Sequence, residues 1–356
     1  MKIIITSPSL NINQNVSGIS SVTQFIIRYN STNEYLHFEL GRKDNEIRNL
    51  KWFFRTLRVY LKWFYLMVTL KDILVHFNLA LTKASIIRDF PLIFMARHLG
   101  KRMIIHIHGG DLFTPKTKYR NTNLFLSLIF SGKNPVIVLG HHEKKVIQEK
   151  FNYKNIFVLP NCIGLKEASE FERLYTNNDI LNLLFLGRIT EDKGIEYIFL
   201  ALKSLKKRGI KFKFIMAGKG PGEKIFIPKF NDLLGSDFEF KGVVAGIHKI
   251  ELLKKCNVFL LPSFYEGLPM ALLESMSFSL VPIITNVGSI KYVISDGVNG
   301  IFVKSHSSEE IVYAIEKLSK DKVYMQKLGN NSRQFIFDKF NPNEYIAKLN
   351  EIYDYE

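Results

Sequence analysis

The chain alternates short apolar runs, rich in β-branched residues, with longer stretches in which apolar residues recur at helical spacing. This alternation is typical of parallel α/β sheets, because a chain must cross back over the sheet before it can enter the next parallel strand. In the first part of the chain we expect helices over about Lys83–Leu99 and Glu143–Phe151. The strands expected there are Lys2–Ser7, Ile73–Phe77, Met103–His108, Pro135–Leu139 and Ile156–Leu159.

A polar stretch at Lys166–Asp179 interrupts the pattern, and a second series of the same kind follows it. Two Rossmann-like, doubly wound α/β domains are therefore expected in tandem, at residues 1–165 and 178–338. In this architecture ligands bind at the carboxyl ends of the strands, here in a central cleft. The elements expected in the second series are strands Ile180–Leu186, Lys211–Ala217, Phe238–Lys241, Val258–Pro262 and Val281–Thr285, and helices Ile195–Arg208, Ile247–Cys256, Pro269–Phe278 and Asn341–Tyr353.

Length and charge agree with two domains and add a preference for anionic partners. A chain of 356 residues is too long for one ordinary core, and its 47% of hydrophobic residues is enough for two. The 49 basic and 33 acidic residues give a net charge of +16. Such an excess favours phosphate-bearing ligands, an acidic membrane or nucleic acid, without choosing among them. A generally basic surface with no such partner is the alternative.

Three further features bear on the cellular compartment. Cys162 and Cys256 lie in apolar stretches without CxxC or Cys/His spacing, so we expect reduced core residues of a cytosolic protein and no metal site. The segment Lys2–Ser7 is short and soon followed by polar residues, which indicates a first strand rather than a signal peptide. No apolar run approaches about 18 residues, so no transmembrane helix is expected.

The segment from Glu266 to Glu274 follows an apolar strand and enters a helix. Gly267 allows a tight turn and Pro269 suits the first helical turn, where a missing N–H costs nothing. Exposed amides at such a helix start form an anion site. The two carboxylates lie roughly two helical turns apart and would face hydroxyl groups rather than phosphate, as in a sugar or ribose. Alternatively, Glu266 caps the helix and Glu274 pairs with a basic neighbour.

Arg188 and Lys193 stand in a polar loop between a strand and the next helix. A planar guanidinium and a flexible ammonium that converge at the carboxyl end of a sheet suit a diphosphate. The alternative is that both are solvated surface cations, as most Arg and Lys side chains are.

Two loops of the first domain are weaker candidates. His108 ends a strand and is followed by two glycines, which would expose it toward a ligand. A hydrogen-bonded structural histidine is the alternative, and His106 points the same way along the strand, so spacing does not decide which of them reaches a ligand. The loop around Gly18 leads into a helix and could bind a phosphate or a sugar, but it matches no established phosphate-binding motif. The alternative is a flexible loop without a ligand.

A stripe of basic residues recurs at steps of three and four in the first domain, with aromatic residues on the remaining helical faces and no acidic residue between Ile47 and Leu70. A basic, aromatic-rich amphipathic helix is typical of binding to an anionic bilayer surface. In the alternative, Leu57, Leu61 and Phe64 pack on the sheet and the basic face is merely solvated. The stripe consists of Arg48, Lys51, Arg55, Arg58 and Lys62.

Taken together, these segments resemble the large family of retaining glycosyltransferases with the GT-B fold, of the family-four type. The resemblance is densest over about residues 180–303. With the sparser matches in the first domain, it covers most of the chain. Its most specific part is the combination of E-x7-E with GRxxxxKG upstream. The matching segments are FLGRITEDKGIEYIFLAL, FIMAGKGP, FKGVV, LLKKCNVFLLPSFYEGLPMALLESMS and VPIITNVGSIKYVISDGVNGIFV, with the Gly18 loop, IIHIHGGD and VLPN in the first domain.

The resemblance implies roles for these residues. The second domain would bind a nucleotide sugar of UDP or GDP type, with Arg188 and Lys193 on the diphosphate and Glu274 on the ribose hydroxyls. Glu266 and His108 would contact the donor sugar, and the tail helix within residues 341–356 would join the first domain. Further donor contacts would come from Gly18, from the backbone at Gly267, Leu268, Pro269 and Met270, and from the region of Val243 beside the base.

The resemblance also implies a metal-independent reaction that retains the anomeric configuration. From the basic stripe Arg48–Lys62 and the absence of an expected transmembrane helix, we expect the acceptor to be a lipid-linked glycan in bacterial capsule, O-antigen or wall-polymer synthesis at the inner face of the membrane. Two departures from the family pattern concern the donor: Ser17 stands where a glycine is common, and Tyr292 where a glutamate is common. The alternatives are another GT-B enzyme, such as a sugar-nucleotide epimerase, and a non-enzymatic nucleic-acid binder. The second has no recognition motif behind it, so no nucleic-acid partner is expected.

Overall fold

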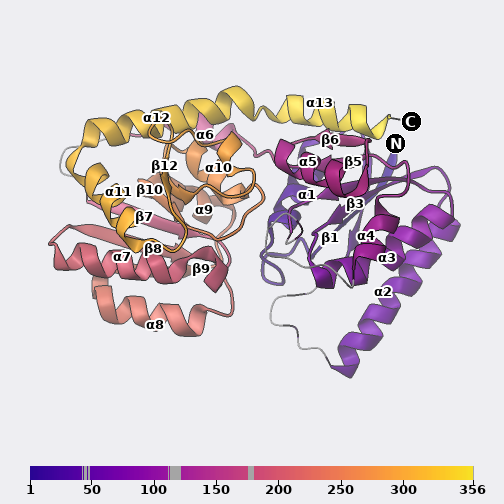
Figure 1. The fold of residues 1–356 in the computed structure, drawn as a ribbon, viewed down its shortest axis with the longest axis horizontal. Helices are drawn as coiled ribbons and strands as arrows, with labels where there is room; N and C mark the ends of the chain where they lie inside the picture. Colours follow the sequence, from indigo (N-terminus) through magenta and orange to yellow (C-terminus); the bar gives the residue numbers. More distant parts are fainter. Residues whose placement is uncertain are drawn as a thin grey trace. The chain divides into compact units, whose positions relative to one another are not determined.

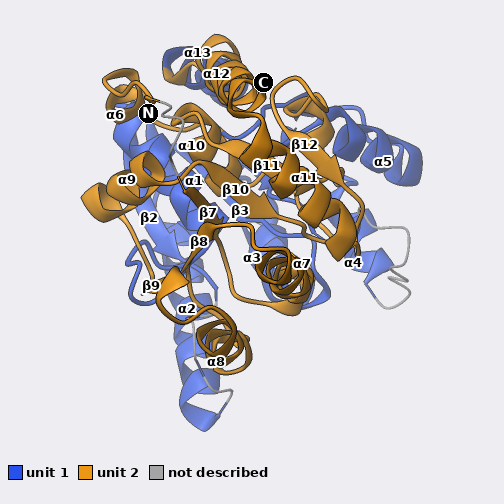
Figure 2. Cartoon of the chain, turned by 90° about the vertical axis from the view of Figure 1, so that its left-hand side faces the viewer, with its two compact units in different colours: residues 1–161, 343–356 blue, residues 162–342 orange. Residues whose placement is uncertain are grey.

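The computed structural model describes residues 1–41, 43, 46, 49–110, 112, 122–174 and 180–355. It divides into two compact units, Met1–Asn161 with Asn343–Glu356 and Cys162–Pro342, which Figure 2 colours separately. Each unit has its own six-stranded sheet, and every strand pair within each sheet is parallel.

Unit 1 has the strand order β2-β1-β3-β4-β5-β6 (Figure 1). The central strands are mainly apolar and are buried along nearly their whole length, as expected where helices cover both faces of a parallel sheet. The strands are β1 (Lys2–Ser7), β2 (Glu34–Glu39), β3 (Ile73–Leu79), β4 (Arg102–Ile107), β5 (Val136–Val138) and β6 (Ile156–Val158).

The helices of unit 1 include the end of the chain. In α13 (Pro342–Tyr353), the Tyr353 hydroxyl lies 2.7 Å from Nδ1 of His76 on β3, and Asn350 accepts a hydrogen bond from Asn30 after α1. The tail helix is therefore part of this unit. The other helices are α1 (Gly18–Tyr29), α2 (Leu50–Thr69), α3 (Lys83–His98), α4 (Asn123–Ile129) and α5 (His141–Phe151).

Unit 2 has the strand order β12-β11-β10-β7-β8-β9 (Figure 1). Its strands are β7 (Leu181–Leu186), β8 (Phe212–Ala217), β9 (Phe238–Gly242), β10 (Val258–Leu261), β11 (Val281–Thr285) and β12 (Ile301–Val303). Its helices are α6 (Lys166–Ser169), α7 (Ile195–Lys207), α8 (Glu223–Leu234), α9 (Gly246–Lys255), α10 (Met270–Ser277), α11 (Ser308–Lys320) and α12 (Lys322–Lys339).

Both sheets reverse their winding direction once, and this reversal places the candidate residues. In unit 1 the chain proceeds from β1 outward to β2 and then returns to β3 on the other side of β1. In unit 2 it proceeds from β7 to β8 and β9 and then starts again at β10, on the other side of β7. Right-handed crossovers then lie on opposite faces, which leaves a crevice at the carboxyl ends of the two strands on either side of the reversal. The predicted pair of doubly wound α/β folds is confirmed.

Some elements differ from the sequence prediction. Strand β2, EYLHFE, was not predicted, because as an edge strand it is half exposed and lacks a continuous apolar run. Strand β12 was also missed, being only three residues long. The two cysteines are unpaired and buried as predicted, and burial raises the pKa of both thiols to about 12.

Candidate functional site

The winding reversal of unit 2 brings together two loops that carry predicted site residues. Lys193 ends a 3-10 turn after β7, and Glu266 lies in the loop between β10 and α10. Lys193 Nζ donates a hydrogen bond to Glu266 Oε1 at 2.7 Å, and both side chains are largely buried, with 18% and 11% of their surface exposed. The amide of Phe264 donates to the carbonyl of Asp192, which ties the two loops together through the backbone.

Glu266 has two further neighbours, one at its carboxylate and one at its backbone. Ser263 Oγ, fully buried, donates to the same Oε1 at 2.8 Å. Gly288 adopts φ +56, and a Cβ there would lie 1.9 Å from the carbonyl oxygen of Glu266. Only glycine therefore lets the loop after β11 approach this closely. The sequence analysis did not single out Ser263 as a candidate, although it lies in the same loop.

Glu274 lies on α10 and forms a second ion pair. Lys249 on α9 donates from Nζ to Glu274 Oε1 at 2.6 Å, with 27% and 19% of the two side chains exposed. Pairing with a basic neighbour was one of the two alternatives for Glu274, and the structure shows that pair in the protein without a ligand. For Glu266 the capping alternative is not what is observed, because its carboxylate contacts Lys193 and Ser263. Lys249 was missed, since only the packing of α9 beside α10 brings it to Glu274.

The remaining predicted residues of unit 2 follow β7, β9 and β10. Arg188 is exposed, two residues beyond the end of β7. Pro269 is the residue before α10 and has no side-chain group that could cap the helix. Leu268 and Met270 are buried, which leaves only their backbone for ligand contact. Gly267 is partly buried in the Glu266 loop, and Val243 is partly buried just after β9.

In unit 1, His108 lies directly after β4 and is partly buried. Its Nε2 is 2.6 Å from Oδ1 of Asn78 on β3, and its ring centroid is 4.1 Å from that of His106. His106 is fully buried, and its Nδ1 lies 3.1 Å from Nε2 of His76. Of the two histidines left open by spacing, His106 is thus the core residue and His108 the one with access to a ligand.

Burial keeps this histidine cluster neutral. It lowers the pKa of His76 and of His108 to about 3, and for His108 the neighbouring imidazole of His76 acts in the same direction. The pKa of His106 is also lowered, mainly by burial. The cluster therefore offers uncharged hydrogen-bonding groups near neutral pH.

Gly18 is the first residue of α1 and is exposed. The preceding Ser17 caps the helix: its side chain accepts a hydrogen bond from the amide of Ile19 at 3.2 Å. A serine at this position thus stabilises the helix start. Gly18 and His108 lie in unit 1, whereas the two ion pairs lie in unit 2.

Helix α2 carries the predicted basic stripe, and its packing differs from the alternative considered for it. Trp63 and Met67 are fully buried, whereas Leu57, Leu61 and Phe64 are 45%, 61% and 50% exposed. The latter three therefore do not form the packing face. They belong to an exposed apolar row with Leu50, Phe54, Tyr65 and Val68.

The basic residues of this helix divide into two groups. Lys51, Arg58 and Lys62 are exposed. Arg55 is paired with Glu46 at 2.7 Å and only 33% exposed, so it is poorly placed to contact a membrane. Arg48 lies outside the described residues.

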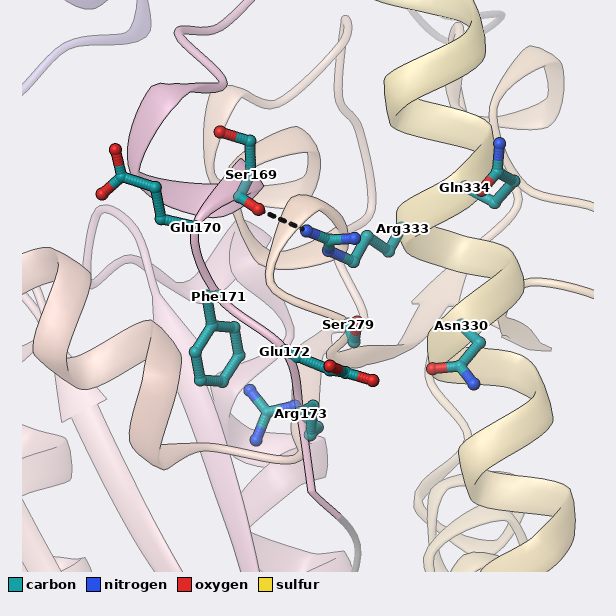
Figure 3. Close-up of a pocket in the computed structure, with 9 residues that line it drawn as sticks. All are labelled: Ser169, Glu170, Phe171, Glu172, Arg173, Ser279, Asn330, Arg333 and Gln334. Carbon is teal, nitrogen blue, oxygen red and sulfur yellow. Dashed lines mark hydrogen bonds between the residues drawn. The ribbon is translucent and has the colours of Figure 1, made fainter.

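A cavity of about 450 Å³ in unit 2 contains none of the predicted site residues (Figure 3). It lies between the segment after α6 and helix α12. Arg333 reaches across it and donates to the carbonyl of Ala168 at 2.7 Å and to that of Ser169 at 3.5 Å, the second of which Figure 3 marks with a dashed line. The guanidinium of Arg173 is likewise bonded to the carbonyl of Phe278. Both guanidinium groups bind backbone carbonyls and hold these segments of the chain in place. We therefore interpret the cavity as part of the structural framework of unit 2 rather than as a ligand site.

Two of the predicted absences concern a metal site and a transmembrane helix. Among those residues, no group of three or more His, Cys, Asp or Glu is arranged to hold a metal ion. None of the helices that the structure describes is long and apolar enough to cross a membrane. Metal independence and the cellular location remain predictions.

The comparisons with known proteins follow the same division of the chain. Residues 166–335 match the family Glycosyl transferases group 1. An uncharacterized glycosyltransferase of Methanocaldococcus jannaschii is 25% identical over 79% of this chain and 76% of its own length. The UDP-Gal:alpha-D-GlcNAc-diphosphoundecaprenol alpha-1,3-galactosyltransferase of Escherichia coli is 25% identical over 72% of this chain and 70% of its own length.

Solved structures extend the likeness to the whole chain. HepE of Anabaena in complex with UDP-glucose superposes with a TM-score of 0.73 at 15% identity, over 99% of this chain and 98% of its own. At that identity the likeness establishes the fold alone. The chain is thus similar to the group 1 glycosyl transferases over residues 166–335, and its two Rossmann-like units have the GT-B fold.

Proposed function

We propose that this protein is a retaining glycosyltransferase that moves a sugar from a nucleotide-sugar donor, of UDP or GDP type, to a lipid-linked glycan acceptor. The product would be part of a bacterial surface polysaccharide, such as a capsule, an O-antigen or a wall polymer. The observation that carries the proposal is the Lys193–Glu266 pair at the winding reversal of unit 2, within the region that matches the family.

The charges of unit 2 suit a diphosphate leaving group. As the bond between the sugar C1 and the phosphate oxygen breaks, negative charge grows on the diphosphate. Lys193 has three N–H donors, and the structure accounts for one of them in the bond to Glu266. Lys193, with Arg188 two residues beyond β7, would stabilise that developing charge. The Glu266 carboxylate, held by Ser263, would face the sugar, whose C1 becomes electron-poor.

Retention of configuration follows if the acceptor attacks from the face that the diphosphate leaves. The acceptor oxygen forms its bond to C1, and its proton passes to the departing phosphate oxygen. This route needs no side-chain general base. The Glu266 and Glu274 carboxylates are both paired with ammonium groups, which suits positioning roles. We expect the reaction to proceed without a metal cofactor.

The proposal of a lipid-linked acceptor and a membrane location rests on helix α2 and on one similar protein. The Escherichia coli enzyme acts on a sugar linked to diphosphoundecaprenol. Helix α2 presents an apolar row that includes Leu57, Leu61 and Phe64, beside the exposed cations Lys51, Arg58 and Lys62. An interfacial helix buries such a row in the acyl region while the cations contact anionic headgroups. The protein would then act as a peripheral enzyme on the inner face of the cell membrane.

The function is tested first by a thermal-shift screen against UDP, GDP and their common sugar conjugates. The nucleotide sugar that stabilises the protein is then used, with a radiolabelled sugar, in transfer to bacterial lipid extracts. Label in the lipid phase is the expected result. Conversion of the nucleotide sugar without transfer would instead indicate the epimerase alternative, and addition of EDTA without loss of activity is expected if no metal is required.

A further inference from the structure

An aromatic cluster joins the two segments that carry the Lys193–Glu266 pair to a third segment of unit 2. It consists of Tyr197 on α7, Phe264 in the loop before α10, and His306 in the turn between β12 and α11. The rings of Phe264 and His306 are stacked, with their centroids 4.0 Å apart and an angle of 14° between their planes. The ring of Tyr197 meets both of them edge-on, at 6.0 Å and 5.2 Å. Three segments that are distant in the sequence thus meet through their side chains.

Phe264 connects this cluster to the ion pair. Its amide donates to the carbonyl of Asp192 at 2.8 Å, and Asp192 directly precedes Lys193. On its other side, the neighbouring Ser263 donates to Glu266 Oε1 at 2.8 Å. A contact that holds the Phe264 ring therefore also holds the backbone on which both residues of the pair stand.

The backbone at His306 restricts which residues can supply the stacked ring. Its φ is +66, in the left-handed region that residues other than glycine seldom enter. Asn, Asp and His enter this region more often than other residues with a side chain, and of these three only histidine has an aromatic ring. Glycine is the ordinary residue for a turn that needs only this backbone conformation. Histidine at this position therefore combines a positive φ with a ring that covers Phe264.

The turn that carries His306 is anchored to the helix that follows it. Ser307 caps α11, because its Oγ accepts a hydrogen bond from the amide of Glu310 at 3.3 Å. The amide of Ser307 donates to the carbonyl of Lys304, also at 3.3 Å, and α11 packs beside α7. The His306 side chain is exposed and so is not part of the core. Its stack on Phe264 therefore acts on the loop of Phe264 more than on the stability of the unit.

We infer that His306 is a positioning residue: its ring, stacked on Phe264, holds the loop of Glu266 in place. The backbone bond from Phe264 to Asp192 extends this effect to the ammonium group of Lys193. A donor that is already in place needs no rearrangement when negative charge develops on the diphosphate, so a looser loop should lower kcat. The catalytic part of this role rests on the proposed function, whereas the effect on the loop belongs to the free protein.

Three variants at position 306 separate the ring from the backbone. His306→Gly removes the ring and relieves the backbone, His306→Asn removes the ring but tolerates a positive φ, and His306→Phe restores a ring but strains the backbone. In His306→Gly, the loss of the stack and the relief of the backbone are of similar size and opposite sign. Its melting temperature should therefore stay close to that of the unaltered protein, whereas His306→Phe should melt at a lower temperature.

Hydrogen exchange of the full-length protein, followed by NMR, measures the loop without any substrate. The Phe264 amide reports local opening, because it is bonded to the carbonyl of Asp192. One aromatic stack changes an opening equilibrium by about two- to tenfold. Exchange at this amide should be faster by that factor in His306→Gly and His306→Asn, and close to that of the unaltered protein in His306→Phe. Unchanged exchange in the two variants without a ring would overturn the inference.

Kinetics with the nucleotide sugar found in the thermal-shift screen test the catalytic role. We expect kcat to fall about tenfold in His306→Gly and His306→Asn with KM little changed, because small displacements of positioning groups lower rates by up to about 100-fold. In His306→Phe, kcat should recover although this variant is less stable. The matched control is Asn152→Gly, which relieves a φ of +50 at an exposed position of unit 1. It should leave kcat and the exchange of the Phe264 amide as they are.

The outcomes separate this inference from the proposed function. If the protein transfers a sugar but kcat is unchanged in His306→Gly, or follows the melting temperature across the three variants, the positioning role of His306 is refuted. If no nucleotide sugar is bound or converted, the proposed function fails, and exchange at the Phe264 amide still decides whether the His306 ring holds the loop.

Discussion

Removal of the three exposed cations of α2 should weaken binding to anionic membranes by a calculable amount. The variant is Lys51→Gln, Arg58→Gln and Lys62→Gln, whose side chains are exposed. A basic residue near an anionic surface contributes about 1 kcal/mol, so three contribute about 3 kcal/mol. Since about 1.4 kcal/mol is a factor of ten, the partition constant should fall roughly 100-fold.

Replacement of the apolar row of the same helix should weaken membrane binding by a similar amount, but with a different dependence on salt. Leu57, Leu61 and Phe64 are 45%, 61% and 50% exposed, so about half of each side chain is available for transfer into the bilayer. Full burial of such a side chain is worth about 1.5–3 kcal/mol, so half of each gives about 1 kcal/mol and the three together about 3 kcal/mol. Their replacement by serine should weaken binding at all salt concentrations, whereas the charge contribution should disappear at high salt.

The assay is sedimentation with phosphatidylglycerol-containing vesicles, at low and high salt, with pure phosphatidylcholine vesicles as reference. The matched control is Lys203→Gln, Lys207→Gln and Lys327→Gln, which removes the same charge from exposed positions of unit 2. The control should bind as the unaltered protein does. If the control and the α2 charge variant lose binding equally, net charge alone is responsible and the argument from α2 is refuted.

Three further predictions concern the site and the core. Glu274→Ala should weaken UDP or GDP binding by about tenfold in calorimetry, because one hydrogen-bonded contact is lost, and an unchanged affinity would contradict its ribose role. Lys193→Met should lower kcat by roughly 100-fold, as removal of one charge-stabilising donor does, and a change confined to KM would assign it to ground-state binding alone. The melting temperature should fall as well, because the largely buried Glu266 carboxylate loses its ammonium partner. The pKa values of His76 and His108 are lowered to about 3 in the folded protein, below the ordinary 6.5. Between these two pH values the unfolded state therefore binds more protons than the folded state, so the free energy of unfolding of unit 1 should rise with pH across this range. Denaturation followed by the fluorescence of the α2 tryptophans, the only two in the chain, checks this, and greater stability at pH 5 than at pH 7 would be inconsistent with it.

Much of the fold followed from the sequence because the central strands of a parallel sheet are buried on both faces. Strands β1 and β11 are each built around a short apolar run, and they lie at the predicted residues. The half-exposed edge strand β2 has no such run and was missed. The resemblance to a known family was also visible in the sequence, because its motifs lie within continuous segments of the chain, such as the loops after β7 and β10.

The partners of the site residues required the structure. Lys193 and Glu266 were both singled out, but their contact at 2.7 Å depends on β10 pairing with β7, which is not adjacent to it in the chain. Lys249 carries no motif, and only the packing of α9 beside α10 places it against Glu274. Asn78 lies within an apolar strand, and only the sheet brings it into contact with Thr6 on β1 and with His108 after β4.

The sequence by itself determined which segments form strands and helices and which loops carry polar chemistry, because burial and periodicity are local properties of the chain. It left the orientation of α2 open, since apolar residues surround most of that helix. The tertiary structure decided it: Trp63 and Met67 fill the interior of unit 1, and Leu57, Leu61 and Phe64 remain at the surface. Which face of a helix is buried depends on the surface available to it, and that surface exists only when the rest of the unit has folded.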